Sequence, residues 1–217
     1  MTKTLVIGDT HGNIKAVKAA LSEGFPVVFL GDYLDSKDRS IEDQVKTLRT
    51  VLKAIEEGKA VGLFGNHDIQ YHYGFQSSSG YRKKTQDYVT HLDMSVLKDY
   101  YWCEGFLLTH AGVNQEMLEY EGYSSVEDYL NDTEKKDRFD WCGWARGGHR
   151  PRGGLRWNDY NWEFIPVPGV NQVFGHTRGK EIREIDNNWC IDVLEDDYST
   201  SYKGLLIEDG KAEIYEF

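Results

Sequence analysis

Side chains that can bind metal ions directly follow five apolar runs in this chain, and this pattern constrains the fold more than any other feature. Short apolar runs of this kind are typical of buried strands. The runs are Leu5–Ile7 before Asp9 and His11, Val27–Leu30 before Asp32, Val61–Phe64 before Asn66 and His67, Phe106–Leu108 before His110, and Val173–Phe174 before His176. If these strands lie side by side, their ends bring the polar side chains to one edge of a sheet, where a two-metal site can form.

The first third of the chain alternates predicted strands and helices. Strands are expected over 4–8, 27–31 and 60–64, and helices over 14–23 and from Ser40 to just before Gly58. Asn13 is the expected N-cap of the first helix, and Ser40 with Asp43 resembles a capping box at the start of the second. This β-α-β-α-β order predicts parallel strands joined by right-handed crossovers.

The rest of the chain is expected to complete a second sheet. Residues 69–104 are predicted to be helical, residues 105–110 to form a strand, and residues 115–165 to be an irregular insert rich in Trp, Arg and Gly. Further strands are predicted over 171–175, 181–185, 189–193, 203–208 and 211–216. Together these elements indicate an α/β (α+β) fold, a two-sheet β-sandwich flanked by helices, in a single domain over residues 1–217.

Composition limits the expected partners and location. The chain has 217 residues, with 25 basic and 36 acidic side chains and a net charge of −11. This acidic balance disfavours binding to duplex nucleic acid, which depends on a basic surface. No apolar run approaches the length needed to cross a membrane, and no charged leader precedes an apolar stretch at the N-terminus. We therefore expect a cytoplasmic protein without a membrane partner.

Five short motifs occur in a fixed order. They are Asp9-Thr10-His11, Gly31-Asp32-Tyr33-Leu34-Asp35, Gly65-Asn66-His67-Asp68, the lone His110 and Gly175-His176. In this order they resemble the calcineurin-like metallophosphoesterase superfamily, whose pattern is D-x-H, G-D-x-x-D-R-G, G-N-H-D/E, a lone His and G-H. Arg178 stands where other branches place a second His. The resemblance is therefore greatest to the phosphoprotein phosphatase branch, which includes small bacterial and phage phosphatases and the diadenosine tetraphosphate hydrolases.

The resemblance implies two divalent metal ions. Asp9 and His11 are expected to bind one ion, and Asp32 to bridge both, because a carboxylate has enough lone pairs for two metals. Asn66, His110 and His176 are expected to complete the ligands of the second ion. Mixed carboxylate, imidazole and amide ligands suit ions of the manganese, iron and zinc kind. Manganese is expected first, with iron, zinc, nickel or cobalt as alternatives.

His67 and Asp35 are expected to form the catalytic pair. The resemblance places His67 on the leaving-group side, where it would protonate the departing oxygen. Asp35 would fix the tautomer of His67 and raise its pKa, as carboxylates do for neighbouring imidazoles. Asp68 is expected to cap or turn the chain.

One residue departs from the family pattern. The usual Arg after the second Asp, which holds substrate phosphate, is replaced by Ser36, followed by Lys37. Another cation must then bind the phosphate, and Arg is favoured because its fork matches phosphate oxygens. The candidates in the insert are Arg156, within a family-like Leu-Arg-Trp-Asn-Asp stretch, then Arg146, with Arg152 and Arg150 nearby. Lys37 or Arg39 is the alternative if the insert does not bind phosphate.

These expectations point to a metal-dependent phosphatase or phosphoesterase that hydrolyses phosphate esters with metal-activated water. A protein Ser/Thr phosphatase acting on a phosphoprotein is the first prediction for the substrate. Hydrolysis of a nucleotide or dinucleoside polyphosphate is the alternative, since aromatic side chains in 141–162 could stack on a base. A non-catalytic interaction module on the same fold is the alternative from another class.

Overall fold

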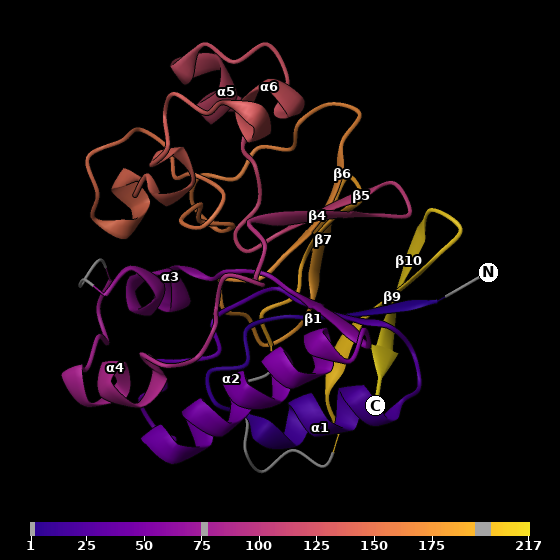
Figure 1. The fold of residues 1–217 in the computed structure, drawn as a ribbon. Coiled ribbons are helices and arrows are strands. Elements are labelled where there is room, and N and C mark those ends of the chain that lie inside the picture. The colour runs from indigo at the N-terminus through magenta and orange to yellow at the C-terminus, as the bar shows by residue number, and fades with distance from the viewer. Residues whose placement is uncertain (1–2, 75–77, 194–200) are drawn as a thin grey trace.

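Two five-stranded sheets form the centre of the computed structural model, which describes residues 3–74, 78–193 and 201–217 (Figure 1). The first sheet has the order β10-β9-β1-β2-β3 and the second the order β4-β5-β6-β8-β7. Their bounds are β1 Thr4–Ile7, β2 Val27–Phe29, β3 Ala60–Gly62, β4 Tyr100–Cys103, β5 Phe106–Thr109, β6 Asn171–Phe174, β7 Arg183–Ile185, β8 Asn188–Cys190, β9 Lys203–Glu208 and β10 Lys211–Glu216. The predicted two-sheet fold flanked by helices is confirmed.

The first sheet grows from the predicted β-α-β-α-β order. β1 pairs with β2 and β2 with β3, both in parallel, as the crossovers require. The crossover helices are α1 (Ile14–Ser22) and α2 (Ile41–Glu56), which lie together on one side of the molecule in Figure 1. The Asn13 side chain accepts a hydrogen bond from the N–H of Ala16, and that of Ser40 from the N–H of Asp43. Both expected caps are therefore present.

Three apolar cores hold the layers together. The core between the two sheets joins Val6 and Val28 of the first sheet, and Leu30 directly after β2, to Phe106 and Val173 of the second sheet. A second core packs α1 and α2 on the other face of the first sheet. A third lies beneath α5 (Gln115–Glu121) and α6 (Val126–Asn131), against the second sheet. Every strand that ends at the candidate site is thus fixed by packing.

The region 69–104 is less helical than expected. Among its described residues, 69–74 and 78–104, helix is confined to α3 (Asn66–Tyr73) and α4 (Lys83–Val89), and β4 joins β5 in an antiparallel hairpin. Gly74 ends α3 in the left-handed conformation, with φ 74°, which a glycine adopts without steric cost. Tyr, Trp and Cys in β4 form a half-buried strand rather than another helical turn.

The insert 115–165 is more ordered than expected. Besides α5 and α6 it contains 3₁₀ helices over Arg138–Asp140 and Trp144–Arg146. Figure 1 shows α5 and α6 at the end of the molecule away from α1 and α2. Among the residues that the structure describes, no helix has both the length and the apolar character needed to cross a bilayer.

Candidate metal centre and active site

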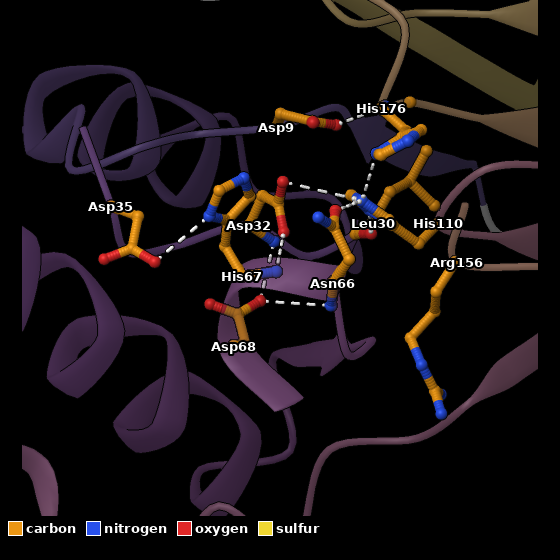
Figure 2. Close-up of polar contacts among 12 residues, drawn as sticks. Asp9, Leu30, Asp32, Asp35, Asn66, His67, Asp68, His110, Arg156 and His176 are labelled. Atoms are coloured by element: carbon orange, nitrogen blue, oxygen red, sulfur yellow. Dashed lines mark hydrogen bonds and ion pairs between the residues drawn. The ribbon is translucent and has the colours of Figure 1, made fainter. Parts of the chain in front are cut away.

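The five motif segments meet where the strand ends of both sheets come together. β1, β2 and β3 lead into the segments with Asp9, Asp32 and Asn66, while β5 and β6 lead to His110 and His176. Figure 2 shows these five side chains converging on one point. A pocket of about 620 Å³ opens over them. Its lining residues are His11, Asp32, Asp35, Ser36, Lys37, Asp38, Arg39, Asn66, His67, Ser79, Gly80, Arg82, Arg146, Trp157, His176, Arg178 and Asp192.

Two groups of potential metal ligands share one carboxylate. Asp9, His11 and Asp32 form one group, and Asp32, His110 and His176 form the other, with all ligand atoms of a group within 4.8 Å of one another. Asp32 is buried between them, and its Oδ2 lies 3.6 Å from His11 Nε2 and 3.5 Å from His110 Nε2. A carboxylate in this position is suited to bridge two ions.

The donor atoms are oriented as a cation would require. His110 Nδ1 donates to the carbonyl of Leu30 at 2.9 Å, so the Nε2 of the neutral ring carries a lone pair. That lone pair faces Asn66 Oδ1 at 3.0 Å, which is also an acceptor, so two acceptors face each other without a hydrogen between them. His11 Nδ1 is held in the same way by the carbonyl of Leu34 at 2.8 Å. The residues present therefore fit divalent ions.

Charge is crowded at the centre of the site. Burial raises the pKa of Asp9 well above its usual value, and the neighbouring Asp192 and Asp32 add to the increase. Burial acts in the same direction on Asp32, but His110, His67 and His11 outweigh it and lower the pKa of that carboxyl. A bound cation would stabilise both carboxylates in their charged form.

The backbone is strained at this site. Four of its residues have the left-handed backbone conformation that non-glycine residues rarely adopt: His11, Asp32, Asp35 and His176, with φ of 39°, 52°, 60° and 66°. Neighbouring glycines allow very close packing against the ligands. A Cβ at Gly65 would lie 2.0 Å from Asp32 Oδ1, and one at Gly175 would lie 2.0 Å from Asp9 Oδ1. Both glycines are therefore required by the position of a carboxylate.

His67 and Asp35 are in contact, as Figure 2 shows. His67 Nδ1 lies 3.0 Å from Asp35 Oδ2. Asp35 also accepts hydrogen bonds from Gln70 Nε2, at 2.6 Å, and from the Tyr71 hydroxyl. Burial lowers the pKa of His67, but Asp32 and the hydrogen bond to Asp35 outweigh it and raise it to about 9. The sequence motifs do not predict Gln70 and Tyr71 as part of this site, although both residues follow His67 by about one helical turn on α3.

Asp68 connects two of the strand ends. Its carboxylate accepts hydrogen bonds from the N–H groups of Asp32 at 2.6 Å, Tyr33 at 2.9 Å and Gly65 at 3.1 Å. It is fully buried, and burial together with the nearby Asp32 raises its pKa to about 8. Asp68 thus fixes the loop that carries Asp32 to the start of α3, in line with the turn role expected for it.

Arg156 does not fill the role expected for it. Its side chain is 3% exposed and binds Asp140 and Asp99, with contacts of 2.7 Å to each. Figure 2 shows it pointing away from the Asp and His cluster. The two carboxylates hold the guanidinium beneath the insert, and Arg156 is absent from the pocket lining. The expectation that Arg156 binds phosphate is therefore corrected.

The other candidate arginines of the insert divide in two. Arg152 is paired with Glu116 and Arg150 with Glu121, and neither lines the pocket. Arg146 does line it: its Nε lies 2.8 Å from Asp159 Oδ2, and its Nη2 donates to Thr177 Oγ1 at 3.0 Å. Among the candidates from the insert, Arg146 is thus the one that lines the pocket.

Four more cationic side chains line the pocket: Lys37, Arg39, Arg82 and Arg178. The first two are the residues that the sequence offers as alternative replacements for the Arg missing after Asp35. Arg82 was not, because it immediately precedes α4 in a segment with no motif, and only the folded chain brings it to the site.

Comparison with known proteins agrees with this geometry. A family model described as calcineurin-like phosphoesterase matches residues 2–178. The chain belongs to the calcineurin-like phosphoesterase family. Membership in this family indicates a hydrolase of phosphate esters. No curated protein matches the sequence significantly.

Two solved structures are similar to this chain. A protein serine/threonine phosphatase from Saccharomyces cerevisiae, described as similar to human phosphatase PP5, aligns with a TM-score of 0.58 and 14% identity over 100% of this chain and 79% of its own. That similarity supports the fold. An archaeal phosphodiesterase aligns with a TM-score of 0.42 and 16% identity over 100% of this chain and 99% of its own.

Proposed function

We propose that this protein is a phosphatase that depends on two divalent metal ions and cleaves phosphate esters by in-line attack of water. The observation that carries the proposal is the position of Asp32, which belongs to both groups of potential metal ligands at the base of the pocket. Asp9 and His11 would complete one ion's ligands, and Asn66, His110 and His176 the other's. Bound ions would lower the pKa of a water molecule and offset the charge of the phosphate.

His67 supplies the proton in this proposal. Asp35 holds Nδ1, so Nε2 of the ring remains for the departing oxygen. The hydrogen bond between Nδ1 and Asp35 favours the protonated ring, as a proton donor requires. Gln70 and Tyr71 hold Asp35 in turn, so the donor is fixed before substrate binds.

Arg146 is the proposed phosphate ligand. Its guanidinium is anchored by Asp159 and Thr177 beside His176, at the wall of the pocket that carries Trp157. An anchored guanidinium loses little conformational freedom when it binds an oxyanion, which favours a precise contact. Arg146 would thereby replace part of the role of the missing family Arg.

Two substrate classes are proposed. A phosphoprotein is proposed first, on the resemblance of the motifs to the phosphoprotein phosphatase branch. A nucleotide or dinucleoside polyphosphate is the second candidate, because Trp157 lines the pocket and offers a flat ring surface to a base.

Hydrolysis of p-nitrophenyl phosphate with each of manganese, iron, zinc, nickel and cobalt tests the proposal. We expect turnover that requires a divalent ion and is abolished by a chelator. A panel of phosphopeptides and dinucleoside polyphosphates then ranks the two substrate classes by kcat/KM. Absence of turnover with every ion and every substrate would favour the non-catalytic interaction module.

A further inference from the structure

The loop after Asp35 is closed by the residue that replaces the usual Arg. Ser36 is buried, and its Oγ accepts hydrogen bonds from the N–H groups of Asp38 at 3.3 Å and Arg39 at 3.1 Å. The Gln44 side chain donates to the carbonyl groups of Ser36 and Arg39 at 3.4 and 2.9 Å. The side chain at position 36 thus stabilises a turn, and it has no cationic group to offer a substrate.

Two cationic side chains lie at this loop and line the pocket, one from the loop itself and one from a distant segment. Lys37 follows Ser36 in the loop, and Arg82 comes from the residue before α4. Arg82 Nη2 donates to the carbonyl of Ser36 at 3.3 Å. Within residues 3–74, 78–193 and 201–217, no carboxylate forms an ion pair with Arg82. Within these residues the positive charge of Arg82 therefore has no acidic partner, whereas that of Arg146 is paired with Asp159.

The position of Arg82 is tied to the proton-donating pair. Its backbone N–H donates to the Tyr71 hydroxyl at 2.9 Å, and that hydroxyl donates to Asp35. A Cβ at Gly80 would lie 3.1 Å from the Asp35 Cβ, so the segment before Arg82 packs directly against Asp35. Arg82 therefore lies on the side of the pocket where His67 would meet the leaving group.

We propose that Arg82, assisted by Lys37, binds a negatively charged group on the leaving portion of the substrate. The enzyme would then prefer phosphate esters whose alcohol carries a second anionic group, either a carboxylate or another phosphate. This inference rests on the proposed phosphatase activity. Asp38 also lines the pocket and contributes a negative charge of its own. An Arg with an exposed side chain is suited to this contact because its fork can bind two oxygens of one anion.

A pair of matched substrates tests the inference: the para-carboxyphenyl and para-carboxamidophenyl esters of phosphoric acid. They have nearly the same shape and differ in the charge of the leaving group. We expect Arg82→Ala to lower kcat/KM for the carboxylate ester by about three- to tenfold, as for a partly screened ion pair. The same substitution should change the carboxamide ester by less than about twofold. Arg82→Lys should retain part of the preference.

Arg49→Ala is the matched control, because Arg49 is an exposed arginine of α2 that pairs with His91 away from the pocket. It should leave both esters unchanged. An equal loss for both esters in Arg82→Ala, or no loss for either, would overturn the inference.

Binding of the corresponding benzylphosphonates, which are not hydrolysed, provides a readout independent of turnover. Calorimetry on the metal-loaded wild type and Arg82→Ala should show the same selective loss for the carboxylated compound. If the wild type hydrolyses neither ester, the proposed function fails, but phosphonate binding still tests the role of Arg82. Weaker binding of the carboxylated phosphonate alone in Arg82→Ala would support that role. Equal weakening for both phosphonates, or none for either, would refute it.

Discussion

His67 depends on a chain of contacts that fixes one ring nitrogen and leaves the other for substrate. Asp35 holds Nδ1, and Gln70 and Tyr71 hold Asp35. We expect His67→Asn to lower kcat by about 10²–10⁴-fold, the usual contribution of a general acid. The loss should be smaller for p-nitrophenyl phosphate than for phenyl phosphate, because a good leaving group needs little protonation.

Elemental analysis should find normal metal content in His67→Asn. His72→Asn is a suitable control on the same helix, since His72 packs on Phe64 and does not line the pocket. Equal losses for the two esters would mean that His67 acts otherwise than by donating a proton.

At the residue scale, the sequence predicts the candidate metal ligands because they belong to short local motifs. Asp9, Asp32 and His110 each follow a buried strand. The strand fixes the position of the side chain, and the apolar run that forms the strand can be recognised in the sequence. Arg82 and Tyr71 carry no such signal, because their roles depend on how the segment after α3 folds back against Asp35.

At the scale of elements, two arginines of the insert that are both candidate phosphate ligands in the sequence have different environments in the fold. Arg156 is buried with Asp140 and Asp99, whereas Arg146 lines the pocket beside Thr177. We expect Arg156→Ala to lower the free energy of unfolding by about 2–3 kcal/mol, less than for a fully buried pair because both carboxylates keep some exposure. Inhibition by inorganic phosphate should not change. Arg146→Ala should instead raise KM and weaken phosphate inhibition together, and it should also lower the free energy of unfolding, because it leaves the buried carboxylate of Asp159 without its ion pair.

Urea unfolding and phosphate inhibition, measured on both variants, check this contrast. Weaker phosphate inhibition in folded Arg156→Ala would restore the role that the motif suggested for it. The Leu-Arg-Trp-Asn-Asp stretch predicts phosphate binding by Arg156 from the residue type alone, because a motif does not show which side chains the arginine will pair with. The two acids lie 16 and 57 positions away, where pairing cannot be seen.

The elements were predicted best where the pattern of apolar residues is regular and where capping or turn residues mark its ends. α1 and α2 begin at the expected caps, and β9 and β10 match the expected bounds. The sequence predicts helix over 69–104, yet the hairpin partner of β4 is needed to decide in favour of a strand.

At the scale of the whole molecule, the candidate metal centre joins the two sheets. Asp9 and Asp32 come from the first sheet and His110 and His176 from the second, and the N–H of His176 donates to Asp9 Oδ1 at 2.8 Å. Metal bound here would connect the sheets and relieve repulsion between buried carboxylates. A ligand that binds the folded state alone stabilises it in proportion to RT ln(1 + [L]/Kd).

We therefore expect a chelator to lower the melting temperature and manganese to restore it. At a hundredfold excess over Kd, one site would raise the melting temperature by about 5–10 °C in a chain of this size. Asp32→Asn should lose most of this shift, because Asp32 belongs to both ligand groups, whereas Asp9→Asn should keep the part contributed by the second site. Thermal unfolding by circular dichroism, with metal content measured on the same samples, checks the ranking. Two ions per chain in Asp32→Asn, with an unchanged shift, would show that the carboxylate does not bridge the sites.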